Sequence, residues 1–414
     1  MKKKNRKNSI QKNSLWMLAA GLCCVCLMSC SEQPIGQTPT DNTPPPQVID
    51  VHVVPTNGGA YITYALPPDE EDISYVKCEF EYNGKQRTVR SSIYKNYMEV
   101  DGIGEPEEIE LKISVVDHSG NVSVPHIEKF TPLDPPMTAI YRSFEVEPAF
   151  GGVKVSWENP AKVMAGISFL ASNDYGELEL KDMVFSSLPA GLKSLRGFNT
   201  DKRLFALSIT DKYENVSDTF RIELEPLYEV MLDKSKFADA HLLGDNFSVN
   251  DGRPINLIWD GVNEGKWNSW HTDAAGGYSI PQHFSIDLGV TAQLTRVVIY
   301  NRTEDIYYYA QHNLRIFDVW GTDVLIHDIT NPYYEESDWK EDWTLLAQCE
   351  IVKPSGSPPG TNTPEDIAAH NAGFEFEFRQ DVPKMRYIRF EVHETWARTP
   401  AIHMGELSVF GDDR

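Results

Sequence analysis

The last third of the chain carries aromatic, amide, histidine and arginine side chains between its apolar stretches. A sugar ring has apolar C–H faces and a rim of hydroxyl groups, so a sugar site combines an accessible aromatic ring with side chains that make directional hydrogen bonds. Both kinds of side chain occur here in segments that we expect to form loops. The candidate ligand-binding residues are Trp267, Asn268, His271, Tyr278, Arg302, Tyr308, Trp396 and Arg398.

Each candidate also has a structural interpretation. His271 follows Trp270, which we expect in the core, and His271 could simply satisfy a loop carbonyl. Arg302 could be structural as well. At least one ring of Tyr307–Tyr309 must point inward if the segment alternates, so not all three can reach a ligand. Trp396 is the strongest single candidate, because the turn around it offers its ring no obvious core.

Strands must position these loops, and this part of the chain alternates apolar and polar residues. Phe284–Gly289, Arg386–Val392 and His403–Gly411 are each typical of a half-buried strand. We therefore predict one sheet-rich domain over residues 229–414.

Seven pieces of this domain follow one another in a characteristic order. They are Asp260-Gly261, Trp270-His271-Thr272, Asp287-Leu288-Gly289, Val297–Arg302, Asp342–Leu346, Arg386–Val392 and Gly405–Gly411. This order resembles the discoidin, or coagulation-factor C-type, family of galactose-binding-like domains. The resemblance implies a discoidin-like jelly-roll β-sandwich with its ligand on the same loops that carry the candidate residues. The sequence departs from the family by an acid-rich insertion before Asp342 and by a Pro- and Gly-rich stretch, Lys353–Thr363.

The resemblance also implies a calcium site. Many family members build one from the loop after an Asp-Gly pair and a Glu near the C-terminus, and Ca²⁺ prefers oxygen ligands. The matching residues are Asp260, Asn263 and Glu406, with loop carbonyls completing the set. The loop is longer than usual around residues 264–266. The alternative to a calcium site is that Asp260 is a turn residue and Glu406 is an exposed acid on a strand. We expect at most one structural Ca²⁺ and no other cofactor.

An internal repeat precedes this domain. Gly58-Gly59 recurs as Gly151-Gly152, 93 residues later, and Asp117 recurs as Asp211, 94 residues later. Each copy consists of short alternating runs broken by turn residues, and a helical apolar pattern seldom persists. Copies of around 90 residues have the size of an immunoglobulin-like sandwich and resemble fibronectin type III domains. We predict these two domains at residues 48–135 and 136–228, as a spacer or platform, and the fold class is all-β.

The first thirty residues have the pattern of a secretion signal. Basic residues without any acid precede an apolar run from Leu15 to Met28, which is shorter than the roughly 20 residues of a spanning helix. Leu27-Met28-Ser29-Cys30 resembles the bacterial lipobox, which implies cleavage before Cys30 and lipidation of its thiol. We predict a lipoprotein signal peptide over residues 1–29 and a Pro-rich tether over residues 30–47.

The composition restricts the partners. The formal net charge is −23, so we do not expect electrostatic binding to nucleic acid or to an anionic membrane face. Apart from the signal and the lipidation site Cys30, only Cys78 and Cys349 are present. Both lie in alternating runs, and we expect two buried, unpaired thiols rather than a disulfide.

Catalytic motifs are missing from the sequence. It has no His-Glu-x-x-His, no Gly-x-Ser-x-Gly and no phosphate-binding Gly loop, and it has no Cys pair for zinc outside the signal. The carboxylates of residues 335–342 crowd into one insertion that no barrel-sized domain surrounds, so a glycoside hydrolase is not expected. We predict that the protein is not an enzyme.

Two classes of function are compatible with these features. The first is a lipid-anchored carbohydrate-binding protein of the outer membrane, facing the cell exterior, which captures a polysaccharide or oligosaccharide for an uptake system. The layout resembles the accessory lipoproteins of the polysaccharide-uptake systems of Bacteroidetes, which implies outer-membrane uptake proteins as partners. The alternative is an adhesion or protein-interaction lipoprotein, since discoidin and fibronectin-like folds bind proteins and matrix as readily.

Overall fold

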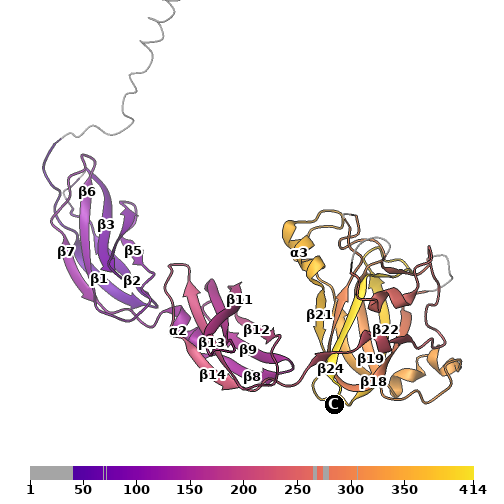
Figure 1. Cartoon of the computed structure of the whole chain (residues 1–414). Helices are drawn as coiled ribbons and strands as arrows, with labels where there is room; N and C mark the ends of the chain where they lie inside the picture. The colour runs from indigo at the N-terminus through magenta and orange to yellow at the C-terminus, as the bar shows by residue number, and fades with distance from the viewer. Residues whose placement is uncertain (1–40, 69, 71, 264–267, 274–278, 305) are drawn as a thin grey trace, which may run out of the picture. The chain divides into compact units, whose positions relative to one another are not determined.

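The computed structural model describes residues 41–414 except 69, 71, 264–267, 274–278 and 305. The predicted signal peptide, Cys30, Trp267 and Tyr278 lie outside the described residues. Strands dominate the chain (Figure 1), and they form the predicted series of β-sandwiches, so the all-β prediction is confirmed. Of the residues that the structure describes, none belongs to a helix long and apolar enough to span a membrane.

The chain divides into two compact units. The first ends at Ala139 and includes Asp211–Ser217, and the second comprises Ile140–Thr210 and Asp218–Arg414.

The first unit contains a sandwich of two antiparallel sheets, with strand orders β1-β2-β5 and β4-β3-β6-β7. Its strands are β1 (Ile49–Thr56), β2 (Gly59–Ala65), β3 (Ile73–Tyr82), β4 (Lys85–Ser92), β5 (Tyr97–Val100), β6 (Ile109–Asp117) and β7 (His126–Phe130). Alternate residues of these strands meet between the sheets, where Ile62, Val76 and Leu111 are fully buried. Cys78 is buried in this core and unpaired, as predicted.

The second sandwich has the sheet orders β12-β9-β8 and β11-β10-β13-β14, and α2 (Pro136–Arg142) precedes it in the chain. Its strands are β8 (Glu145–Ala149), β9 (Gly152–Glu158), β10 (Ala165–Ser172), β11 (Leu178–Ser186), β12 (Ala190–Arg196), β13 (Arg203–Asp211) and β14 (Phe220–Leu224). Trp157 is buried and its ring lies 6.2 Å from that of Phe169, between centroids. Trp157 is therefore part of the core of this sandwich.

The repeated Gly-Gly pair has the same structural role in both sandwiches. Gly58 and Gly151 have φ of +70° and +68°, in the left-handed region that glycine adopts at little cost. A Cβ on Gly59 would lie 1.9 Å from a carbonyl oxygen of the neighbouring strand, and one on Gly152 would lie 1.8 Å from the corresponding oxygen. A side chain at either position would push that strand away, which accounts for the repeat in the sequence.

The last sandwich is organised around one long strand, β18. Its strands are β15 (Val230–Met231), β16 (Ala238–Asp239), β17 (Trp270–His271), β18 (Gln282–Tyr300), β19 (Leu314–Thr322), β20 (Thr344–Glu350), β21 (Phe374–Glu377), β22 (Met385–Thr395), β23 (His403–Met404) and β24 (Glu406–Asp412). The first half of β18 pairs with β22, and the second half pairs with β24 and β21. Gly289, with φ of +66°, lies between the halves. The predicted strand Phe284–Gly289 is therefore the first part of a longer strand. The two halves of this strand belong to the two layers of the sandwich, one with β22 and the other with β24 and β21.

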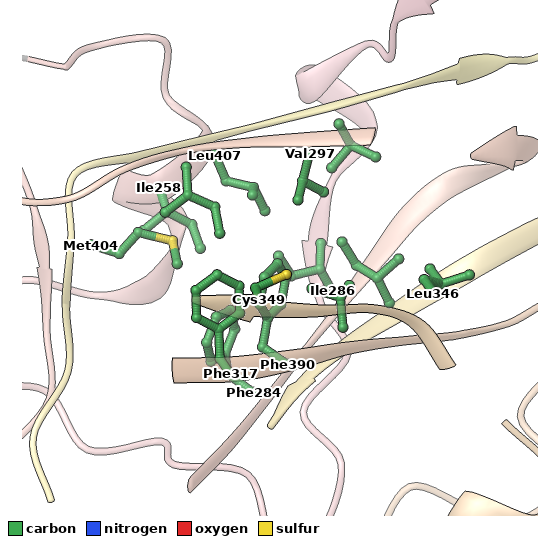
Figure 2. Packing of buried hydrophobic residues seen from close by; sticks show 14 of the residues in the cluster. Ile258, Phe284, Ile286, Val297, Phe317, Leu346, Cys349, Phe390, Met404 and Leu407 are labelled. Carbon is green, nitrogen blue, oxygen red and sulfur yellow. The ribbon is translucent and has the colours of Figure 1, made fainter. Parts of the chain in front are cut away.

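Aromatic rings fill the space between these layers (Figure 2). The rings of Phe284 and Phe390 stack with 4.6 Å between their centroids, and Phe317 lies 6.0 Å from Phe390. Cys349 is buried beside them and unpaired, as predicted. Burial of each large apolar side chain contributes about 1.5–3 kcal/mol, so this core holds the strand ends that carry the loops.

The acid-rich insertion forms a second, smaller core. It contains two 3-10 turns, η3 (Pro332–Tyr334) and η4 (Asp338–Glu341). Tyr334 and Trp339 are buried and cluster with Leu242, while the acids of the segment are exposed. An interpretation that rests on the acids alone misses these inward-facing rings.

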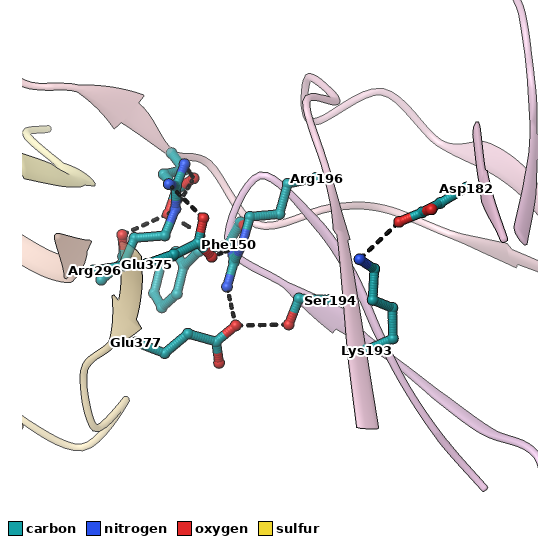
Figure 3. A network of polar contacts seen from close by, with 10 residues as sticks. Phe150, Asp182, Lys193, Ser194, Arg196, Arg296, Glu375 and Glu377 are labelled. Carbon is teal, nitrogen blue, oxygen red and sulfur yellow. Dashed lines mark hydrogen bonds and ion pairs between the residues drawn. The ribbon is translucent and has the colours of Figure 1, made fainter. Parts of the chain in front are cut away.

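Side chains of the second unit pair with the acids of β21 (Figure 3). Arg196 Nε donates to Glu375 Oε1 at 3.0 Å, and Ser194 Oγ donates to Glu377 Oε1 at 2.6 Å. Glu375 also accepts a hydrogen bond from Arg296 at 3.1 Å. These carboxylates therefore have partners within the protein and are not available as ligand-binding groups.

Candidate functional site

The pairing of β17 with β23 sets one side of the site. The two strands run antiparallel, with His271 opposite His403. Trp270 is buried, and its ring lies 4.9 Å from that of Phe284, between centroids, so its expected position in the core is confirmed. Successive residues of a strand face opposite sides. Anchoring Trp270 in the core therefore directs His271 to the other side, towards the loops.

Buried amide side chains shape the loop between β18 and β19. Asn301 exchanges two hydrogen bonds with the backbone of Leu314, at 3.0 and 3.1 Å. Asn313 accepts from the backbone N–H of Arg302 at 3.2 Å and donates to the carbonyls of Arg302 and Tyr307 at 3.0 and 2.7 Å. These bonds fix the backbone positions from which the side chains of Arg302 and Tyr307 extend.

Three histidine rings meet at this place. We call His271, His312 and His403 the histidine cluster. The centroid of the His403 ring lies 3.9 Å from that of His271 and 4.8 Å from that of His312. His403 is 2% exposed and His271 is 9% exposed, so the cluster lies within the loops rather than on their outer surface.

A hydrogen bond assigns the proton of one of these rings. Arg253 Nη2 lies 2.8 Å from Nδ1 of His271, and because arginine only donates, Nδ1 must accept and the neutral ring carries its hydrogen on Nε2. His312 Nδ1 contacts the hydroxyl of Thr399, which leaves its Nε2 for another partner. Both ring nitrogens of His403 are buried without a hydrogen-bond partner among the described residues.

The surroundings keep the cluster neutral near pH 7. Burial, followed by the charge of Arg253, lowers the pKa of His271 to about 4. Burial also lowers the pKa of His312 and that of His403, with the charge of Arg302 acting in the same direction. Neutral imidazoles can each donate and accept a hydrogen bond, which suits the hydroxyl groups of a polar ligand.

Arg302 and Tyr307 complete the site. The guanidinium of Arg302 is 2% exposed and lies 3.6 Å from the centroid of the Tyr307 ring. Arg302 Nη2 donates to Glu304 at 3.2 Å, whereas Nε has no partner among the described residues. The Tyr307 ring lies 5.7 Å from that of His403. A cation, an aromatic ring and three neutral imidazoles thus lie together.

The structure brings together two of the predicted ligand-binding residues, His271 and Arg302. Asn268 is half-buried beside the buried Ser269. Tyr308 packs on His370, with 5.0 Å between ring centroids, so Tyr307 rather than Tyr308 reaches the site. Tyr309 is fully buried, which confirms that one of the three tyrosines points inward.

Sequence reasoning missed His312, His403 and Arg253. His403 stands in an alternating run that predicts a strand, and nothing local distinguishes it from a structural residue. The signal that could have found it is the match between two short segments, Trp270-His271 and His403-Met404, which each join an apolar residue to a histidine.

Trp396 and Arg398 lie elsewhere. With Arg315, Val352, Lys353 and Pro358 they line a groove of about 400 Å³. The Trp396 ring is half-buried, packs against the core and lies 5.4 Å from the Tyr309 ring, between centroids. The expectation that this ring has no core to enter is therefore wrong. The Arg398 side chain is 75% exposed and pairs with Glu394 at 3.4 Å.

The three residues proposed for calcium lie near one another. Glu406 is buried, and burial and the Asp260 charge raise its pKa. Its Oε1 pairs with Lys234, and its Oε2 has no partner among the described residues. Asn263 Oδ1 approaches Gly405, at 3.1 Å from where a Cβ would stand. This set of oxygens fits a hard cation, although Lys234 already supplies a positive charge to Glu406.

Calcium binding stays a proposal, which chelation tests. If Ca²⁺ binds to Asp260, Asn263 and Glu406, EDTA lowers the melting temperature of the full chain by about 5 °C, and added Ca²⁺ restores it. The alternative is that the Lys234 ammonium takes the place of the cation. In that case EDTA has no effect, whereas Lys234→Met lowers the melting temperature.

Comparisons with known proteins found matching families and similar solved structures. Three families, each described as a domain of unknown function, match residues 45–132 (DUF4959), 133–235 (DUF5126) and 259–411 (DUF5000). The comparison with curated proteins found no match. Among solved structures, the chain is similar to a family 32 CBM from C. perfringens NanJ in complex with galactose, with 16% identity, a TM-score of 0.30 and coverage of 44% of this chain and 98% of that chain. It is also similar to a segment of two fibronectin type III domains from chicken tenascin, with 13% identity, a TM-score of 0.23 and coverage of 43% and 99%.

Fold and site together define a multidomain β-sandwich protein whose polar site lies in the loops of its last sandwich. A solved SusE-like protein is 31% identical, with a TM-score of 0.42 and coverage of 68% of this chain and 100% of that chain. On this identity over the whole length of the relative, the chain belongs to the SusE-like family.

Proposed function

We propose that the protein is a non-catalytic carbohydrate-binding protein and that its glycan site consists of the histidine cluster with Arg302 and Tyr307. The observation that carries this proposal is the pair of unpartnered ring nitrogens on buried His403, beside an aromatic ring and a guanidinium. Buried polar groups ordinarily have partners. A ligand with several hydroxyl groups would supply them.

The geometry suits a sugar in two respects. His271 Nε2 carries a hydrogen to donate, since Nδ1 accepts from Arg253. Tyr307 is half-buried and offers part of its ring to the apolar face of a sugar. The loop hydrogen bonds of Asn301 and Asn313 hold these groups in place before a ligand arrives, which lowers the entropy cost of binding.

The location and partners belong to the same proposal. The lipobox-like segment that ends at Cys30 supports a lipid anchor, and membership of the SusE-like family supports an outer-membrane location at the cell surface. In this arrangement the two fibronectin-like sandwiches act as a spacer, and the last sandwich captures glycan for an uptake system.

A glycan panel tests this function. The full chain should be retarded in native gels that contain at least one polysaccharide of a panel of plant, animal and microbial glycans. Arg302→Gln should weaken that binding by about 10- to 100-fold, because a hydrogen bond to a charged group contributes about 1.5–3 kcal/mol. Arg398→Gln, in the separate groove, should leave it unchanged.

The melting temperature of each variant shows whether it folds, and Tyr307→Leu tests the same site without removing a buried charge. If no polysaccharide retards the chain, the proposal is wrong. An adhesion or protein-interaction role would then be the function to test.

A further inference from the structure

The histidine cluster has the composition of a metal site. One nitrogen from each of His271, His312 and His403 lies within 4.8 Å of the others, and neutral imidazole is a common ligand of zinc and copper. Whether the site takes a cation or an anion depends on its protons and on the charges around it.

The assigned protons oppose a metal ion. His271 Nδ1 accepts from Arg253, so the hydrogen of this neutral ring is on Nε2. A nitrogen that carries a hydrogen cannot ligate a metal, and one that accepts from a guanidinium is already occupied. His271 would have to break its bond to Arg253 before it could serve as a ligand.

The nearby charges oppose a metal ion as well. The side chains of Arg253 and Arg302 are only 5% and 2% exposed, whereas their acidic partners Asp251 and Glu304 are 61% and 32% exposed. The positive groups therefore lie inside the site, and the negative groups lie nearer to solvent, where water screens them. Both arginines lower the pKa of His403 through their charge, after the larger effect of burial.

Two donors in this positive site lack an acceptor among the described residues. Arg302 Nε has no hydrogen-bond partner among the described residues, and neither has the N–H of buried His403. Neutral His403 has one such N–H, because only one of its two nitrogens is protonated. Arg302 presents a planar set of donors that matches a carboxylate. The missing partner is thus an acceptor with negative charge.

We propose that the glycan bound at this site contains a uronic acid, whose carboxylate lies against Arg302 and His403. This inference rests on the proposed carbohydrate-binding function and narrows its ligand class. The sugar ring lies on Tyr307, and its hydroxyl groups accept from His271 Nε2.

Matched sugars test this inference by calorimetry on the full chain. The probes are oligosaccharides that contain glucuronate, galacturonate, mannuronate or guluronate, each beside its carboxyl-reduced counterpart, which keeps the ring and replaces the carboxylate with a hydroxymethyl group. At least one acidic oligosaccharide should bind about ten-fold or more tightly than its reduced counterpart, and 0.5 M NaCl should diminish this difference.

Other outcomes separate the two proposals. If reduced or neutral oligosaccharides bind as well as the acidic ones, the uronic acid inference is wrong while carbohydrate binding stands. If no oligosaccharide, acidic or neutral, binds, and no polysaccharide retards the chain, both are wrong. Saturable Zn²⁺ binding that His403→Gln abolishes would overturn the inference in favour of a metal site.

A substitution that should increase affinity tests the position of the carboxylate. Glu304→Gln removes the acid that pairs with Arg302 and should tighten binding of the acidic oligosaccharide about three-fold, because the guanidinium loses a competitor. Its reduced counterpart should bind as before. Glu394→Gln is the matched control, since Glu394 pairs with Arg398 beside the separate groove. If Glu394→Gln instead tightens binding of the acidic oligosaccharide, the carboxylate lies in that groove and the inference is wrong.

Discussion

Replacing Arg389 with leucine is expected to lower the free energy of unfolding by about 3–5 kcal/mol. Arg389 is fully buried, and its Nη2 lies 3.0 Å from Oδ1 of Asp245, which is 2% exposed. Asp245 also accepts from the backbone of Leu242 and from Ser285. Without the guanidinium, the carboxylate would be a buried charge with no countercharge, and these two weaker bonds would not replace it.

Denaturation with urea, followed by tryptophan fluorescence, measures this effect. Arg386→Leu is the matched control, because Arg386 lies on the same strand and pairs with Asp287 at 2.8 Å, but its side chain is 43% exposed. An exposed pair contributes about 0–1 kcal/mol. The double variant Asp245→Leu/Arg389→Leu should recover part of the loss. Equal effects of the Arg389 and Arg386 variants would show that burial does not set the energy of the pair.

The stability of the last sandwich should fall steeply as the pH drops from 6.5 to about 4. Burial lowers the pKa of His271 and of His370 to about 4, whereas an unfolded histidine has a pKa of about 6.5. In this range the unfolded chain binds protons that the folded chain does not. The contribution of these histidines to the free energy of unfolding is therefore fully present above pH 6.5 and is lost as the pH falls. At pH 4, each of these two rings lowers the free energy of unfolding by about 3 kcal/mol relative to neutral pH.

Burial raises the pKa of Glu406, so protonation of this carboxyl group stabilises the folded chain as the pH falls. More histidines than this one acid change the stability, since burial lowers the pKa of His312 and of His403 as well. We therefore expect a net loss of stability.

Thermal melts between pH 7 and pH 4 check this dependence. His370→Phe should flatten it, because phenylalanine keeps the ring contacts with Tyr309 and Phe374 and cannot bind a proton. A melting temperature that stays constant from pH 7 to pH 4.5 would contradict the assignment of neutral buried histidines.

Patterns visible along the chain account for most of the fold. The alternation of Arg386–Val392 arises within a few residues, and the Gly-Gly pair recurs after 93 residues. Both signals can be read from the sequence, and both indicate sandwiches. The turn at Gly289 is harder to see, since a bent strand and two separate strands have the same alternation. The buried rings of the insertion are hard to predict for another reason. Tyr334 and Trp339 stand among exposed acids, so the overall composition of the segment indicates a solvated surface.

The site is less accessible to sequence reasoning than the fold. His271 and Arg302 belong to the right chemical types beside predicted strands, so they can be found. His403 becomes part of the site only because β23 pairs with β17, which is a long-range contact. Trp396 has the right chemistry in a predicted turn, but its ring enters the core next to Tyr309, where only the three-dimensional arrangement of the loops reveals space for it.

The central claim is that glycan binds at the histidine cluster, and a crystal structure of the full chain with the tightest-binding oligosaccharide of the panel tests it most directly. The account predicts a sugar ring against Tyr307, with oxygen atoms within hydrogen-bonding distance of Arg302, His271 and His403. A sugar found instead in the groove beside Trp396 and Arg398, or on one of the two fibronectin-like sandwiches, would contradict it.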